Sequence, residues 1–185
     1  PDEDVKFRLH ELIVINTRTF QRLFSIKQLG LAYFIYPFAT HTRGAHSISC
    51  LSWAQKIIDS LEVNLLHSNF PEKKYFLNHV KKNKNAIRLT ALLHDISHIP
   101  FSHTLEDENL IFEEHDKSER LRIIMNHLKN DINSLDKLEC PQLFFRLSEE
   151  KYSNMKKDLT KKLETVKKIL NLNNRVEGLT NDEKD

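Results

Sequence analysis

Hydrophobic positions along this chain recur mainly at the spacing of amphipathic helices. Phe20, Leu23 and Phe24 would share one side of a helix over residues 17–29, with Thr17 as its N-cap and Gly30 after its end. The same kind of reading predicts helices over residues 46–61, 86–98, 104–112 and 113–130. Heptad-like spacing amid lysines predicts one more amphipathic helix, a candidate for docking a partner, with an apolar side of Leu159, Leu163, Val166 and Leu170.

Other segments give a less regular pattern. Residues 7–15 form a short apolar run that suits either a strand or a helix, and residues 64–85 read as a loop with part of an exposed helix. Residues 31–38 are aromatic and broken by Pro37, so we expect a buried loop or a short extended piece. The tails, residues 1–6 and 171–185, are expected to be frayed and disordered respectively.

Composition supports an all-α fold. Of 185 residues, 39% are hydrophobic and 29% charged, an ordinary balance for a soluble domain. With 3 Gly and 5 Pro, turn signals are sparse, which favours helices. The character changes after Asp131, so we divide the chain into a core, residues 1–135, and a helical extension with a disordered tail, residues 136–185.

The charge and the cysteine content of the chain limit which partners and which cellular compartment we expect. The formal net charge of +2 is too small to indicate nucleic-acid binding, and we expect the lysines of residues 64–85 to be a solvated face rather than a nucleic-acid patch. Cys50 and Cys140 make no disulfide framework, so a reducing cytoplasm is the default. We find no secretory signal and no apolar run of about 18 residues. Because the chain starts at Pro1, we expect a trimmed or partial product.

Candidate chemistry concentrates in residues 91–103, where an apolar run leads directly into His94 and Asp95. His98 and His103 follow within ten positions, and we expect the helix to end around His98 because Pro100 disfavours its continuation. A buried Asp beside a buried His is costly unless each is paired or binds a metal. Taken alone, His94 and Asp95 could be a core histidine and a helix-capping aspartate. The nearby His98 and His103 favour a functional site instead.

Three further residues are candidates with structural alternatives of their own. His46 begins a predicted helix, where packing or capping explains it equally well. Arg43 lies near the same helix start, where a cation is disfavoured unless an anion binds, so it is a candidate phosphate contact or else a surface salt bridge. His115 opens a later helix and suits either a catalytic histidine or a cap.

The motifs together resemble a known family. His46 followed much later by His94-Asp95 has the spacing of an HD-domain metal site. Several longer blocks stand in the order found in the deoxynucleoside triphosphate triphosphohydrolase branch of the HD superfamily, which the chain resembles over about residues 9–130. The blocks are Phe20-Gln21-Arg22-Leu23, Ile26-Lys27-Gln28-Leu29-Gly30, His41-Thr42-Arg43 with His46-Ser47, and Leu92-Leu93-His94-Asp95 with His98 and Pro100-Phe101-Ser102-His103.

This resemblance implies an all-α HD-domain helical bundle over residues 1–135 and a divalent metal held by His46, His94 and Asp95. Nitrogen and carboxylate ligands suit Fe, Mn, Ni or Zn, and Mg less well. The implied reaction removes intact triphosphate from a deoxynucleoside triphosphate and leaves a deoxynucleoside. The implied substrate contacts are Gln28 and Leu29 at the deoxyribose, Arg43 at phosphate, and His98 and His103 lining the phosphate and metal region. The implied catalytic residues are His115, oriented by Glu106, together with His98.

The chain departs from the family pattern at several positions. The family's second metal-binding Asp, in a later Asp-rich helix, has no matching motif here. Gly44 and Ala45 stand where acidic and aromatic residues are usual, and Ser97 and Ile99 replace the glycines that usually flank His98. One alternative is therefore a degenerate or truncated HD module that binds nucleotide or a partner without catalysis.

A second alternative is an HD phosphohydrolase for another substrate, such as a nucleoside monophosphate or a cyclic dinucleotide. Gln28 argues against it, because that residue matches the branch acting on deoxynucleoside triphosphates. For all these readings we expect a nucleotide partner, no membrane and no nucleic acid, and a cytoplasmic location. The resemblance would also allow a homo-oligomer.

Overall fold

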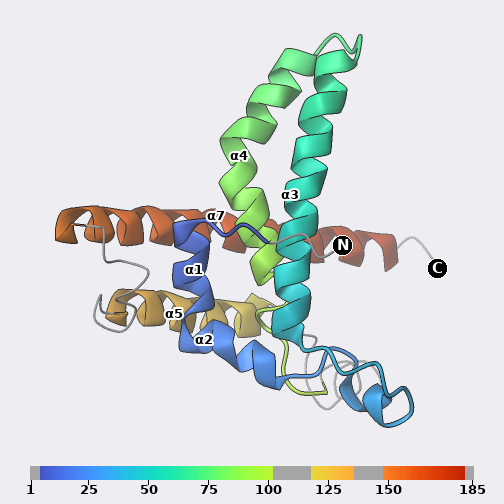
Figure 1. Cartoon of the computed structure of the whole chain (residues 1–185), viewed down its shortest axis with the longest axis vertical. Helices are drawn as coiled ribbons and strands as arrows, with labels where there is room; N and C mark the ends of the chain where they lie inside the picture. The colour runs from blue at the N-terminus through green and yellow to red at the C-terminus, as the bar shows by residue number, and fades with distance from the viewer. Residues whose placement is uncertain (1–4, 102–117, 136–147, 182–185) are drawn as a thin grey trace.

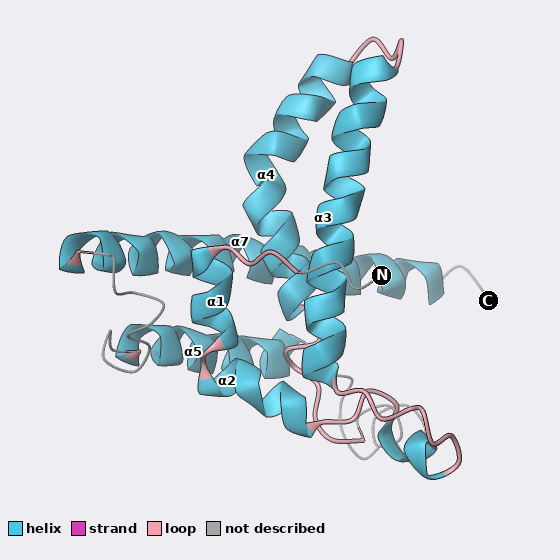
Figure 2. Cartoon of the chain, viewed as in Figure 1, coloured by secondary structure: helices cyan, strands magenta, loops and turns pink. Residues whose placement is uncertain are grey.

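The computed structural model describes residues 5–101, 118–135 and 148–181, and helices dominate these ranges (Figure 2). Within these ranges, β pairing consists of one isolated antiparallel bridge between Lys27 and Thr42. The prediction of an all-α fold is confirmed. The elements are α1 (Leu9–Ile15), α2 (Arg18–Gln21), the 3-10 helices η1 (Arg22–Ser25) and η2 (Gly30–Phe34), α3 (Arg43–His67), α4 (Lys73–Leu93), α5 (Ser118–Ser134) and α7 (Glu149–Asn181).

The long helices α3 and α4 form an antiparallel hairpin whose connecting end projects away from the other helices (Figure 1). At the opposite end of the hairpin, α4 packs against α7, while α3 packs against η1. The short helices α1 and α2 lie beside α5, and α5 in turn packs on α7. This arrangement brings the start of α3 and the end of α4 together at the body of the molecule.

The core forms where these helices meet. Leu89, Leu92 and Leu93, in the last turns of α4, are fully buried. The apolar side of α7 joins the same core, with Leu159, Leu163, Val166 and Leu170 between 0% and 8% exposed. The prediction that this side docks a partner is therefore wrong, because helices of the same chain already cover it. The division of the chain at residue 135 stays a prediction.

Several helix boundaries differ from those predicted. Thr17 is the N-cap that we expected, accepting a hydrogen bond from the Phe20 amide at 3.2 Å, but the helical turns end at Ser25. Helix α4 spans residues 73–93 rather than 86–98, and the chain then turns, with the Ile96 amide donating to the Leu93 carbonyl at 3.0 Å. Helix α3 is longer than predicted at both ends. Of the two structures considered for residues 7–15, a strand or a helix, the segment forms the helix α1. Helix α7 continues to residue 181, past the predicted start of disorder at 171.

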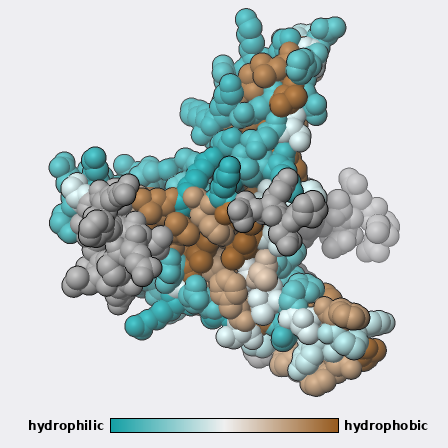
Figure 3. Space-filling view, viewed as in Figure 1, coloured by the Kyte–Doolittle hydropathy of each residue, from teal (hydrophilic) through white to brown (hydrophobic). Residues whose placement is uncertain are grey.

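The expectation that residues 31–38 are buried is wrong. Phe34, Ile35 and Phe38 are 71%, 76% and 98% exposed, and an apolar surface extends over this segment in the lower part of Figure 3. Gly30 adopts a φ of 55°, the left-handed region that favours glycine, and the chain turns there into η2. No helix within the described ranges combines the length and the apolar character needed to cross a membrane.

The apolar residues of α3 do not all lie on its buried side. Trp53 and Ile57, which share a face with Cys50, are 63% and 57% exposed. The neighbouring stripe of Leu51, Ala54 and Ile58 is buried instead, against the other arm of the hairpin and the core. Periodicity identified a helix here but not the side that it buries, because apolar residues occur on both sides.

Candidate metal centre

The start of α3 is tied to an extended segment that precedes it by about fifteen residues. The Arg43 amide donates to the Ile26 carbonyl at 2.9 Å, and the Gln28 amide donates to the His41 carbonyl at 3.1 Å. Thr42 then caps α3 with its side-chain oxygen. These backbone hydrogen bonds place Gln28 and Arg43 side by side, and both side chains donate a hydrogen bond to Asp95.

Gly44 allows α3 to begin in close contact with η1. A Cβ atom at this position would lie 2.7 to 2.9 Å from three ring atoms of Phe24, closer than side chains approach one another. The replacement of the family's usual residue by Gly44 thus has a packing reason in this chain.

Three potential metal ligands converge where the two arms of the hairpin meet. His46 and Cys50 lie one turn apart on α3, and His94 follows the last residue of α4. The imidazole rings of His46 and His94 lie edge to face, with their centroids 5.2 Å apart. One donor atom from each of His46, Cys50 and His94 lies within 4.8 Å of the others. The fold therefore brings together side chains that are far apart in the sequence in the way that a metal ion requires.

The orientation of the His94 ring points to a cation. Its Nδ1 is 2.9 Å from the Ala91 carbonyl oxygen, so Nδ1 carries a proton and donates it there. In the neutral ring, Nε2 then has a lone pair, and this atom lies 3.2 Å from Oδ1 of Asp95. Two electron-pair donors at this distance repel one another unless a cation or a proton lies between them. The arrangement fits a site for a divalent metal.

Asp95 is held as a carboxylate by the side chains around it. Its Oδ2 accepts hydrogen bonds from Nη1 of Arg43 at 2.9 Å and from Nε2 of Gln28 at 3.3 Å, and its Oδ1 lies 3.4 Å from Nε2 of His98. Burial alone would raise the pKa of Asp95. The hydrogen bond from His98, the positive charge that His94 and His98 carry when protonated, and the charge of Arg43 outweigh burial and hold that pKa well below its usual range. Asp95 can therefore act as an anionic ligand at neutral pH.

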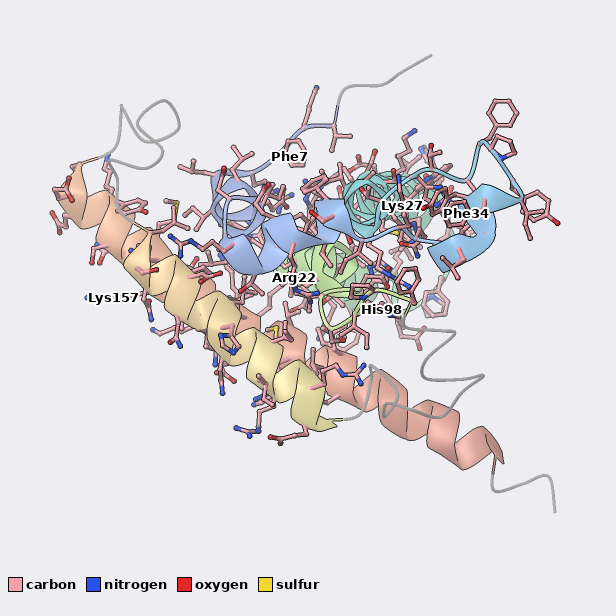
Figure 4. The ribbon with its side chains drawn as sticks, turned by 90° about the horizontal axis from the view of Figure 1, so that it is seen from below. Phe7, Arg22, Lys27, Phe34, His98 and Lys157 are labelled. Atoms are coloured by element: carbon pink, nitrogen blue, oxygen red, sulfur yellow. The ribbon has the colours of Figure 1, made fainter. Side chains whose placement is uncertain are left out.

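The turn that carries these groups is supported by Arg22, which lies on η1. Its guanidinium donates to the carbonyl oxygen of His98 at 2.6 Å and also to that of Ile96. Figure 4 shows Arg22 pointing toward the turn that contains His98. Because helix α4 has ended, these carbonyls have no helical amide to bind, and Arg22 satisfies them. Arg22 thus fixes the backbone on which His94, Asp95 and His98 are arranged.

His46 is suited to act as a neutral ligand. Burial lowers the pKa of His46, with smaller effects in the same direction from His94 and Arg43, while Asp95 opposes them. An imidazole must be unprotonated at one nitrogen to bind a metal. The surroundings of His46 favour this form at neutral pH.

The predicted substrate-binding residues lie in different environments. Gln28 approaches Asp95, and its Oε1 is buried without a hydrogen-bond partner among the described residues. Leu29 is 51% exposed, whereas Arg43 is 2% exposed and paired with Asp95. The predicted site residues His103, Glu106 and His115 lie outside the described residues.

Sequence reasoning missed Cys50 and Arg22 as parts of this site. Cys50 follows His46 by four positions, which places both on one side of a helix, and that spacing was a usable signal. Arg22 stood within one of the quoted motifs, but nothing local predicts that its guanidinium binds carbonyls more than seventy positions away.

Similarity to known proteins extends over much of the chain. The family model described as "HD domain" matches residues 43–173, which is more than half of the chain. A putative HD domain-containing protein of Acanthamoeba polyphaga mimivirus is 33% identical over 136 residues, covering 65% of this chain and 29% of the viral protein. An uncharacterized protein of Methanocaldococcus jannaschii is 38% identical over 104 residues, covering 56% of this chain and 19% of the archaeal one.

Some of the similar proteins have a stated activity. The deoxynucleoside triphosphate triphosphohydrolase SAMHD1 of Homo sapiens is 36% identical over 100 residues, covering 53% of this chain and 14% of the human protein. The matched part of this chain thus corresponds to less than a third of the length of each of these relatives.

Proposed function

The chain belongs to the HD domain family, and on that premise we propose that it is a metal-dependent phosphohydrolase that acts on deoxynucleoside triphosphates. The reaction would release a deoxynucleoside and intact triphosphate. Support for this substrate class comes from the motif series in residues 20–103 and from the similarity to human SAMHD1.

The observation that carries the hydrolase proposal is the contact between His94 and Asp95. With Nδ1 of His94 committed to the Ala91 carbonyl, its Nε2 faces Oδ1 of Asp95 at 3.2 Å, an arrangement that a metal cation stabilises. His46, His94 and Asp95 would hold the ion. A divalent ion bound there would supply charge stabilisation for phosphoryl oxygens and a water of lowered pKa.

The remaining roles belong to side chains around these ligands. Gln28 and Arg43 orient Asp95 through its Oδ2, which leaves Oδ1 directed at His94. The buried Oε1 of Gln28 would accept a hydrogen bond from the sugar hydroxyl of a nucleotide. Leu29 would contact the deoxyribose, and Arg43 would bind phosphate once a substrate competes for its guanidinium.

The histidines of the proposed site would handle protons and phosphate. His98 would serve as a donor beside the metal, and His103 would line the phosphate region. His115, oriented by Glu106, would assist attack or protonate the leaving group.

The test is chromatographic product analysis. The purified chain is incubated with each deoxynucleoside triphosphate in the presence of Mn²⁺, Fe²⁺ or Mg²⁺, and we expect deoxynucleoside and triphosphate in equal amounts. His94→Ala should abolish turnover, while Lys81→Ala, an exposed residue of the same α4 helix, should leave it unchanged. A folded, metal-loaded chain that leaves every deoxynucleoside triphosphate intact would contradict the proposal.

One observation favours a second candidate, a module that binds nucleotide without hydrolysing it. Arg43, expected at the phosphate, is buried and paired with Asp95 at 2.9 Å. In such a module this ion pair would replace the metal as the partner of Asp95. Calorimetric binding of a deoxynucleoside triphosphate in the absence of added metal, with no product formed when metal is supplied, would favour this candidate over the first.

A further inference from the structure

Cys50 lies beside His46 and His94, two of the proposed metal ligands. It is a free cysteine on α3, one turn after His46, and its Sγ is 3.5 Å from Nε2 of His46. A donor atom of His94 completes a group in which all three ligand atoms lie within 4.8 Å of one another. Asp95 approaches this group through its contact with His94.

The separation of sulfur and nitrogen matches what a shared ion would impose. With sulfur at about 2.3 Å and imidazole nitrogen at about 2.0 Å from a tetrahedral zinc ion, the two donor atoms lie about 3.5 Å apart. A thiol hydrogen bond to the imidazole would give a similar separation. The convergence of His94 from the other arm of the hairpin is what distinguishes a coordination site from such a pair, because a hydrogen bond needs no third donor.

We propose that Cys50 is a ligand of the metal ion, so that His46, Cys50 and His94, with Asp95 beside them, form a site that prefers zinc to magnesium or manganese. Thiolate and imidazole are softer donors than carboxylate and water, and they select Zn²⁺ over the harder ions. On binding, the S–H bond breaks, a metal–sulfur bond forms, and the proton passes to solvent. This inference rests on the metal site of the proposed function but not on the hydrolysis of any nucleotide.

The experiment uses Co²⁺ as a spectroscopic substitute for Zn²⁺ in the full chain. The wild type and Cys140→Ser, the matched control, should show a near-ultraviolet sulfur-to-cobalt charge-transfer band. Cys50→Ser should lose the band and bind zinc about tenfold or more weakly in competition with a chromophoric chelator. Absence of the band from the wild type, or its persistence with unchanged zinc affinity in Cys50→Ser, would overturn the inference.

A measurement on the wild type keeps the inference testable if Cys50→Ser folds poorly. Bound zinc should slow the alkylation of Cys50 by iodoacetamide, followed by peptide mass spectrometry, and leave the rate at Cys140 unchanged. Equal alkylation of Cys50 with and without zinc would count against ligation. A chain that shows the cobalt band yet leaves deoxynucleoside triphosphates intact would uphold Cys50 as a ligand while contradicting the proposed activity.

Discussion

Arg88 and Glu11, 77 positions apart in the sequence, form a buried two-point ion pair that joins α4 to α1. Nε of Arg88 lies 2.6 Å from Oε1 of Glu11, and Nη2 lies 2.7 Å from Oε2. The remaining donors of Arg88 bind Oε1 of Gln55 at 2.7 Å and the Lys6 carbonyl at 3.0 Å. Each of the three nitrogen atoms of this guanidinium thus donates at least one hydrogen bond within the protein.

Breaking this pair should destabilise the fold strongly. Glu11→Gln or Arg88→Met leaves a buried charge without its partner, so we expect the free energy of unfolding to fall by about 3–5 kcal/mol, measured by urea denaturation. Replacing both residues, as Glu11→Leu with Arg88→Met, should recover most of the loss. Arg122→Ala, which removes the solvent-exposed pair with Glu119, is the control and should change little. A similarly small effect of Glu11→Gln would mean that the pair is not buried in solution.

Helix α7 should contribute to folding rather than to partner binding. Leu163 is 0% exposed, so Leu163→Ala should lower the free energy of unfolding by about 2–5 kcal/mol through lost burial and the cavity that remains. Leu66→Ala, the same substitution at a site that is 61% exposed, should change it by less than about 0.5 kcal/mol. Urea midpoints for the two variants check the difference. Equal midpoints would argue that the apolar side of α7 is not packed against this chain.

The stability of the fold should fall as the solution becomes acidic, in part through His10. Burial lowers the pKa of His10, assisted by Lys162 and Arg8 and opposed by Glu11 and Asp158. The unfolded chain, with an ordinary histidine pKa of about 6.5, then binds the proton more readily than the folded one. The contribution is fully present above about pH 6.5 and is lost as the pH falls below it.

The variant His10→Gln isolates this effect. Between pH 7 and pH 5, thermal unfolding should show a smaller loss of stability in the variant than in the wild type, because glutamine does not titrate. Equal losses in the two proteins would assign the acid sensitivity to other groups, such as His46, whose pKa burial also lowers.

Arg22 should influence metal binding without contacting the metal. Its guanidinium holds the carbonyls of Ile96 and His98, so Arg22→Met should loosen the turn that presents the ligands and weaken zinc binding about 10–100-fold, as removal of outer hydrogen bonds to metal ligands does. Titration calorimetry measures the affinity. Arg18→Met, at an exposed position on α2, is the matched control. Unchanged affinity in Arg22→Met would show that the turn holds its shape without this residue.

The sequence by itself determined the helical class and several local features, and it predicted where the candidate site lies. The apolar spacing over residues 113–130 predicted the helix that the structure shows as α5, and Thr17 was identified as a cap. These features depend on residues within one or two turns of each other, so local spacing suffices to predict them. The sequence predicted His46, His94 and Asp95 as metal ligands because their order and spacing resemble those of an HD-domain metal site. That pattern does not give the distances between the three side chains.

Only the tertiary structure decided which side chains meet. Apolar residues lie on both sides of α3 and along residues 31–38, and the packing of the hairpin determines which of them are buried. The placement of Cys50 beside His94 depends on the alignment of two long helices, and the support of the turn by Arg22 depends on η1 lying against α3. These are long-range contacts whose free energy comes from packing and buried hydrogen bonds, which a local pattern does not encode.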